Sequence, residues 1–165
     1  MNKVFNDVIA PAEIIKAATE VMGSIDFDPC STPKINRFIG AREILVADSR
    51  NPNTEWAGGT WMFPPYESRL DFLSWLAKGF EEYRLHRSSQ LMILTEGRPS
   101  DRHIQYLLSQ VGSSFCFFKQ LGTFRDECTG EVIPKLKSKS FILSYQGVYK
   151  EAFRKEFSPF GAVIG

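Results

Sequence analysis

The sequence predicts one α/β domain, a three-layer sandwich in which helices cover both faces of a mostly parallel sheet. Segments with the apolar period of a helix alternate with short, continuously apolar segments along most of the chain, and this alternation is typical of strand–helix–strand units. The length of 165 residues suits one hydrophobic core and is too short for two comfortable ones. We therefore assign residues 1–165 to a single domain.

The first helix is predicted to begin at Pro11, because proline fits the first turn of a helix, and to end at Gly23. Its apolar side chains recur at helical spacing. A short strand is expected at residues 24–28, where Ile25 and Phe27 alternate with polar neighbours.

Residues 29–43 are predicted as a loop because Pro, Ser, Thr, Lys, Asn, Arg and Gly are mixed there. Strands are expected at residues 43–46 and 60–63, and the second of them is stopped by Pro64 and Pro65. The two prolines therefore follow the carboxyl end of a strand, which is where open α/β sheets bind ligands.

The middle of the chain carries the strongest periodic signals. Ser68 is a candidate cap for a helix that extends to about Leu85. Residues 90–95 form the clearest buried strand, and a helix from Ser100 or Asp101 through Val111 follows it.

The C-terminal third is predicted to add strands at residues 115–118, 140–145 and 161–164 and a helix at residues 149–157. Residues 122–133 contain a turn-rich centre and are predicted as an antiparallel hairpin. Such a hairpin makes the sheet mixed.

The composition is that of an ordinary cytosolic globular protein, with 43% apolar and 24% charged residues. No apolar run reaches the roughly 18–20 residues of a membrane span. Cys30, Cys116 and Cys128 stand far apart and form no paired metal-ligand pattern with the two histidines. We expect reduced thiols, no metal site and a cytoplasmic location.

The formal net charge of +1 gives no global basic excess of the kind that announces nucleic-acid binding. Any nucleic-acid contact has to come from a local patch. The candidates are Lys34, Arg37, Arg42 and Arg50, and separately Lys135, Lys137 and Lys139. The plain alternative is that these are solvated surface residues.

The most informative motif is Trp-Met-Phe-Pro-Pro-Tyr at residues 61–66. Upstream of it, in order, stand Ala10-Pro11, Phe27-Asp28-Pro29-Cys30, Asn36 with Phe38, Asp48 and Trp56. Over about residues 9–95 this order resembles the small phage-type DNA N6-adenine methyltransferases, the Dam-like family. The typical family motif is Asn-Pro-Pro-Tyr, so Phe63 stands where a polar residue belongs.

The resemblance implies a Rossmann-like methyltransferase sheet and transfer of a methyl group from S-adenosylmethionine to adenine in DNA, in a bacterial or phage-infected cell. The catalytic loop would be Phe63, Pro64, Pro65 and Tyr66. The carbonyl of Pro64 would accept a hydrogen bond from the adenine amino group, and Tyr66 would stack on a base flipped out of the duplex.

The same resemblance places the cofactor near Pro11, Asp28 and Pro29. The segment after the first strand contains no glycine, unlike most methyltransferases, and the family shares this absence. There is no room for a separate recognition domain, so DNA specificity would come from loops.

Phe63 cannot accept a hydrogen bond, so one amino proton of the target adenine would face an apolar ring. An unmade buried hydrogen bond costs on the order of 1–3 kcal/mol, and lost orientation adds to this, so we expect transfer at least tens-fold slower. Two alternatives remain. The protein is non-catalytic and binds DNA, cofactor or a protein partner, or the missing acceptor is supplied by Asp28 or Glu67.

Several of these residues also have plain structural explanations. Asp28 could cap the loop that follows its strand. Trp56 and Trp61 are predicted to be packing residues, and Cys30 a small filler without a nucleophilic role. Arg98 follows the strongest strand and could contact a phosphate, but an ordinary surface ion pair is the preferred explanation.

Overall fold

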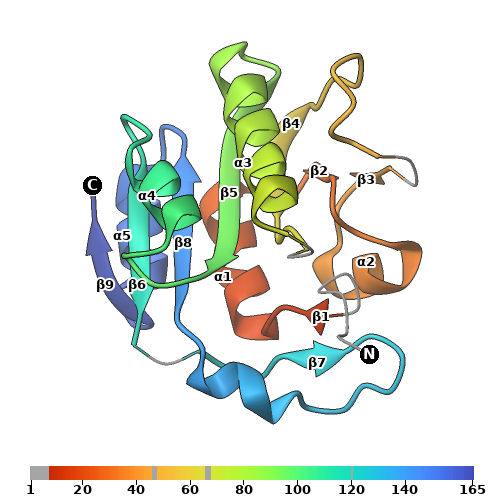
Figure 1. Cartoon of the computed structure of the whole chain (residues 1–165), viewed down its shortest axis with the longest axis vertical. Helices are drawn as coiled ribbons and strands as arrows, with labels where there is room; N and C mark the ends of the chain where they lie inside the picture. Colours follow the sequence, from red (N-terminus) through yellow and green to blue (C-terminus); the bar gives the residue numbers. More distant parts are fainter. Residues whose placement is uncertain (1–7, 46–47, 66–67, 120) are drawn as a thin grey trace.

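The computed structural model describes residues 8–45, 48–65, 68–119 and 121–165. A seven-stranded sheet with the strand order β3-β2-β4-β5-β8-β6-β9 forms its centre (Figure 1). The strands are β2 (Phe27–Asp28), β3 (Glu43–Ile44), β4 (Gly58–Met62), β5 (Ser88–Glu96), β6 (Ser114–Phe118), β8 (Phe141–Gln146) and β9 (Gly161–Ile164). The helices are α1 (Ala12–Met22), α2 (Pro33–Ile39), α3 (Arg69–Arg84), α4 (Arg102–Leu108), α5 (Lys150–Phe157) and the 3₁₀ helix η2 (Pro134–Ser138).

The sheet is mixed and partly parallel, which confirms the predicted α/β class. Neighbours β3, β2, β4 and β5 are parallel, whereas β8 is antiparallel to both β5 and β6, and β9 is antiparallel to β6. The antiparallel pairs therefore come from β8 and β9. The segment predicted as a hairpin does turn back on itself, through a bridge between Arg125 and Val132. Its strand β7 (Arg125–Asp126), however, pairs with β1 (Val8–Ile9) outside the main sheet.

Helices cover both faces of the sheet. Helices α1 and α5 lie together on one face and α3 and α4 on the other (Figure 1). Each face has its own apolar cluster: Ile14 and Phe153 belong to the first, and Leu76 and Ile104 belong to the second. Because β5 contributes side chains to both clusters, residues 91–94 are buried without alternation. This explains why the sequence of β5 is continuously apolar.

Part of the predicted loop at residues 29–43 is the helix α2, so that prediction was wrong for this piece. The Thr32 hydroxyl accepts a hydrogen bond from the backbone N–H of Ile35 at 3.2 Å, which caps the helix. Gly40 ends it in the left-handed conformation with φ of 74°. The helix was missed because only Ile35 and Ile39 are buried, which is too few apolar residues to establish a period.

Strand ends differ from the predictions near the proposed motif. Strand β2 is limited to Phe27–Asp28, and β4 ends at Met62, so Phe63 lies just past the strand instead of inside it. The end of the strand predicted at residues 43–46 lies outside the described residues. None of the described helices is long and apolar enough to cross a membrane.

A buried ionic cluster fixes α3 to the chain that precedes β4. The carboxylate of Glu82, which is 0% exposed, accepts hydrogen bonds from the ammonium of Lys78, the guanidinium of Arg87 and the backbone N–H of Trp56. Burial by itself raises the pKa of Glu82, but these three donors outweigh it and lower that pKa to about 2. Glu82 is therefore ionised at neutral pH, as its buried partner Lys78 requires.

We expect the Glu82→Gln variant to lose about 3–5 kcal/mol of unfolding free energy, because it leaves Lys78 buried without its counter-charge. Urea denaturation at pH 7, followed by tryptophan fluorescence, measures the loss. The matched control is Glu81→Gln, an exposed position on the same helix, where the change should stay within about 0.5 kcal/mol. Equal stability of the two variants would show that the cluster does not hold α3 in place.

Candidate functional site

The strand order of the sheet creates a switch point between β2 and β4. From β2 the chain moves outward to β3, and it then returns to the other side of β2 to form β4 and β5. Connections that leave two parallel neighbours in opposite directions open a crevice at the carboxyl ends of those strands. Asp28 ends β2, and Phe63 follows the end of β4. Two motifs distant in the sequence therefore meet where an α/β sheet binds its ligands.

The side chain of Asp26 sets the alignment of these two short strands. Its carboxylate accepts a hydrogen bond from the backbone N–H of Gly59 at 2.8 Å, and its own N–H donates to the carbonyl of Gly59 at 2.8 Å. The neighbouring Gly58 has φ of 67°, and a Cβ there would lie 2.4 Å from the Asp26 carboxylate. Glycine is therefore required where the strands approach each other.

A small cavity of about 10 Å³ lies at the switch point, room for about one water molecule. Ala10, Asp28, Cys30, Trp61 and Phe63 are among the residues that line it. The indole N–H of Trp61 is buried and has no hydrogen-bond partner among the described residues. The lining of the cavity is therefore mainly apolar, and Asp28 is its one carboxyl group.

The carboxyl group of Asp28 is buried, with only 3% of the residue exposed. Burial raises its pKa to about 7, although the backbone N–H of Cys30, which donates to Oδ1 at 2.9 Å, acts in the opposite direction. This hydrogen bond is the loop cap considered from the sequence. The group also faces the cavity, so capping and ligand contact are compatible.

Cys30 is a thiol at neutral pH. Burial and the nearby carboxyl of Asp28 both raise its pKa well above the ordinary value, so it is a poor nucleophile. Cys30, Cys116 and Cys128 are all free, which agrees with the expectation of reduced thiols. In the part of the chain that the structure describes, no group of His, Cys, Asp and Glu is arranged to hold a metal ion.

The side chain of Phe63 is part of an aromatic cluster. Its ring centroid lies 5.9 Å from that of Phe124 and 6.4 Å from that of Phe141, and the latter two rings stack at 4.7 Å. The ring is partly buried against the core beneath α1. The first position of the loop therefore packs, and it presents no polar atom to the cavity.

The other residues expected in the site have varied positions. Pro64 and Pro65 are buried directly after β4. Pro11 starts α1, and its carbonyl accepts the first helical hydrogen bonds. The carbonyl of Pro29 accepts a hydrogen bond from the hydroxyl of Ser49 at 3.2 Å, which ties the loop after β2 to the chain near residue 49. Tyr66 and Glu67 lie outside the described residues.

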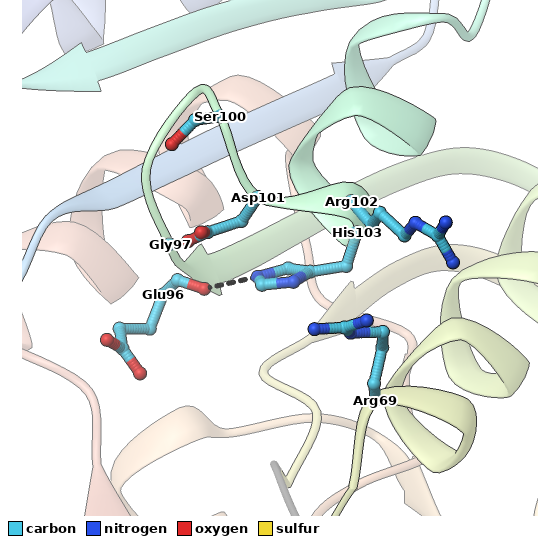
Figure 2. A pocket seen from close by; sticks show the side chains of 7 residues that line it. All are labelled: Arg69, Glu96, Gly97, Ser100, Asp101, Arg102 and His103. Carbon is cyan, nitrogen blue, oxygen red and sulfur yellow. Dashed lines mark hydrogen bonds between the residues drawn. The ribbon is translucent and has the colours of Figure 1, made fainter.

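A second, larger cavity of about 410 Å³ opens near the end of β5 (Figure 2). It is lined by Arg69 at the start of α3, by Glu96 and Gly97 at the end of β5, and by Ser100, Asp101, Arg102 and His103 before and within α4. Arg98, considered from the sequence as a phosphate contact, lies in the segment between β5 and α4. Arg98 does not line the cavity, and among the described residues its side chain has no ion pair.

The floor of this cavity depends on Gly97. The ring of His103 donates from Nε2 to the carbonyl of Glu96 at 2.8 Å and packs edge-on against Phe72. A Cβ on Gly97, which has φ of 156°, would lie 2.6 Å from that nitrogen and 2.7 Å from Ile104. No other residue type permits His103 to approach this closely.

The basic residues considered from the sequence are dispersed. Arg50 is structural: its guanidinium pairs with Asp48 and Asp71 and lies 4.8 Å from the ring centroid of Trp75. Arg42 pairs with Asp26 at 3.7 Å. Lys135 and Lys137 are exposed on η2, and Lys139 lies 3.9 Å from Glu96.

Both tryptophans discussed above are packing residues, as predicted, because Trp56 is 1% exposed and Trp61 is 0% exposed.

Comparison with known proteins adds no family to this geometry, since neither the protein-family models nor the curated proteins contain a match to the sequence.

We expect Asp28 to make the stability depend on pH. Its carboxyl has a pKa of about 7 in the folded protein against an ordinary value of 3.8, so the folded protein binds this proton more tightly than the unfolded chain does. The unfolding free energy therefore falls as the pH rises through that window. Asp28→Asn keeps the acceptor for the Cys30 N–H and cannot ionise, so this fall should disappear.

Urea denaturation of both proteins at pH 5 and pH 8 measures the effect, which is expected to be a few kcal/mol. Glu20→Gln, an exposed position on α1, is the control and should behave as the wild type does. Parallel pH profiles for wild type and Asp28→Asn would mean that the carboxyl is not buried as described.

Proposed function

We propose that this protein is a methyltransferase-fold domain that binds S-adenosylmethionine and methylates the N6 amino group of adenine in DNA, with transfer weakened by Phe63. The supporting observation is that the switch point brings the Asp28 segment and the Phe63-Pro64-Pro65 segment together around one cavity. These are the two motifs that carry the resemblance to the Dam-like enzymes. A Rossmann-like methyltransferase sheet is the finer fold assignment that goes with this proposal.

The chemistry requires acceptors for the amino protons of adenine, because the nitrogen lone pair is delocalised into the ring and has to be freed and aimed at the methyl group. Pro64 retains its carbonyl, which is one acceptor. Phe63 offers none. Asp28 lines the same cavity as Phe63, and with a pKa of about 7 it is partly ionised at neutral pH, so its carboxylate is the available second polar group.

The residues that line the small cavity at the switch point suit S-adenosylmethionine chemically, but the cavity is too small to hold it. A carboxylate at the end of β2 can bind the cofactor's amino or hydroxyl groups, and the unsatisfied N–H of Trp61 can donate to it. A volume of about 10 Å³, however, is far below the roughly 300 Å³ or more of typical ligand pockets. Binding therefore requires Phe63 and the loop after β2 to move apart.

The packing of Phe63 favours a second function, a non-catalytic protein that binds DNA, cofactor or a protein partner. The ring contacts Phe124 and Phe141, so its position is stabilised by the core and not by a substrate. In this alternative the fold and a binding function are retained, and only the transfer step is lost.

We expect the Phe63→Asn variant to transfer methyl groups at least tens-fold faster than the wild type, because it restores an acceptor for the adenine amino group. The measurement uses tritiated S-adenosylmethionine and adenine-containing duplex DNA. Phe63→Leu is the matched control, since it removes the ring without adding an acceptor and should not gain activity.

The outcomes separate the two functions. Transfer by the wild type, or transfer that appears only in Phe63→Asn, supports the methyltransferase assignment. If neither protein transfers a methyl group and calorimetry detects no binding at millimolar S-adenosylmethionine, the assignment is overturned and only the non-catalytic function is left.

A further inference from the structure

We propose that the cavity between α3 and α4 is a phosphate-binding subsite that holds the backbone of a nucleic acid beside the proposed base pocket. This inference rests on the proposed function, since it names the part of the protein that would hold the DNA strand. The cavity has a volume of about 410 Å³, which admits a phosphodiester together with an adjoining sugar.

Two arginines supply the positive charge. Arg69 and Arg102 come from different helices and line the same cavity. Among the described residues, neither guanidinium has an ion-pair or hydrogen-bond partner. In Figure 2 the Arg69 guanidinium reaches toward the ring of His103, and Arg102 lies on the same side of the cavity. A planar guanidinium with unused donors suits the oxygens of a phosphate.

The acidic residues of the cavity are engaged elsewhere. Asp101 accepts a hydrogen bond from the backbone N–H of Arg98 at 2.7 Å. The carboxylate of Glu96 lies 3.9 Å from the ammonium of Lys139 and points away from the two arginines in Figure 2. Among the described residues, neither carboxylate forms an ion pair with Arg69 or Arg102.

The position of the cavity favours a nucleic acid over a free anion. Arg69 begins the helix that follows the Phe63-Pro64-Pro65 segment, and Glu96 ends β5, the neighbour of β4. A base extruded toward that segment carries its phosphates just outside it. The ammonium of Lys139, 3.9 Å from the carboxylate of Glu96, adds a third positive group beside the cavity. Positive groups of this kind are what a nucleic-acid backbone requires.

The test measures DNA binding independently of methyl transfer. A fluorescent duplex oligonucleotide is titrated with the full-length protein at several salt concentrations, using wild type, Arg69→Gln and Arg102→Gln. Each variant should weaken binding roughly ten-fold, and by the same factor for unrelated DNA sequences. The slope of log K against log salt concentration should become shallower by about 0.9, which is the value for one lost phosphate contact. Arg69→Lys should keep part of the affinity that Arg69→Gln loses, because lysine keeps the positive charge but lacks the planar guanidinium that donates two hydrogen bonds to one phosphate.

The control is Arg84→Gln, an exposed arginine at the opposite end of α3, which should leave both affinity and slope unchanged. Circular dichroism checks that each variant is folded, as we expect because the replaced arginines are exposed. Equal losses of DNA affinity in Arg84→Gln and Arg69→Gln would overturn the subsite, because they would show that affinity depends on net charge and not on the position of the arginine. Stabilisation of the wild type by inorganic phosphate without any DNA binding would overturn the nucleic-acid assignment.

Failure of this inference is distinguishable from failure of the proposed function. If the arginine variants lose DNA affinity while no protein transfers a methyl group, the subsite stands and the enzyme assignment does not. If methyl transfer is observed and Arg69→Gln and Arg102→Gln bind DNA as the wild type does, the subsite is overturned alone.

Discussion

The parallel pairing of β2 with β4 is the constraint on which the candidate site depends. Strand β2 has only two residues and pairs with β4 through Phe27 and Thr60, so the main-chain ladder alone gives little alignment. The carboxylate of Asp26 adds to the alignment of the two strands by accepting a hydrogen bond from the backbone N–H of Gly59. Since a shift by one residue turns every side chain to the opposite face, this hydrogen bond determines that Asp28 and Phe63 share a cavity.

Phe63 packs against two aromatic rings at the position where the proposed function would place a polar acceptor. An asparagine there would have to keep its carboxamide satisfied against the neighbouring rings of Phe124 and Phe141 in the absence of substrate, which is costly for a buried polar group. The phenyl ring instead joins them, and such aromatic contacts contribute about 0.5–1.5 kcal/mol beyond their buried area. Functional sites commonly sacrifice stability for chemistry. If the protein has the proposed function, Phe63 favours packing over chemistry at this position.

The sequence predicted those features that depend on local pattern. Helices α1 and α3 and strand β5 have clear periods or long apolar runs, and the prolines after β4 marked the end of a strand correctly. Features that depend on distant pairing were not predictable. The pairing of β1 with β7 joins residues more than a hundred positions apart, and the larger cavity exists only because α3 and α4 lie side by side. The raised pKa of Asp28 also required the structure, because burial is its main cause.

The two cavities differ in chemical character, and the proposed function would place a base at one and its phosphate at the other. The smaller one is lined mainly by apolar side chains around one carboxyl group, and the larger one is polar and has two unpaired guanidinium groups. Helix α3 contributes Arg69 at its start to the larger cavity, and it is fixed near its other end by the buried cluster around Glu82. A rigid helix anchored far from the site can hold Arg69 in place without adding polar groups beside the apolar pocket. The ionic cluster at Glu82 thus fixes α3 near the end opposite Arg69.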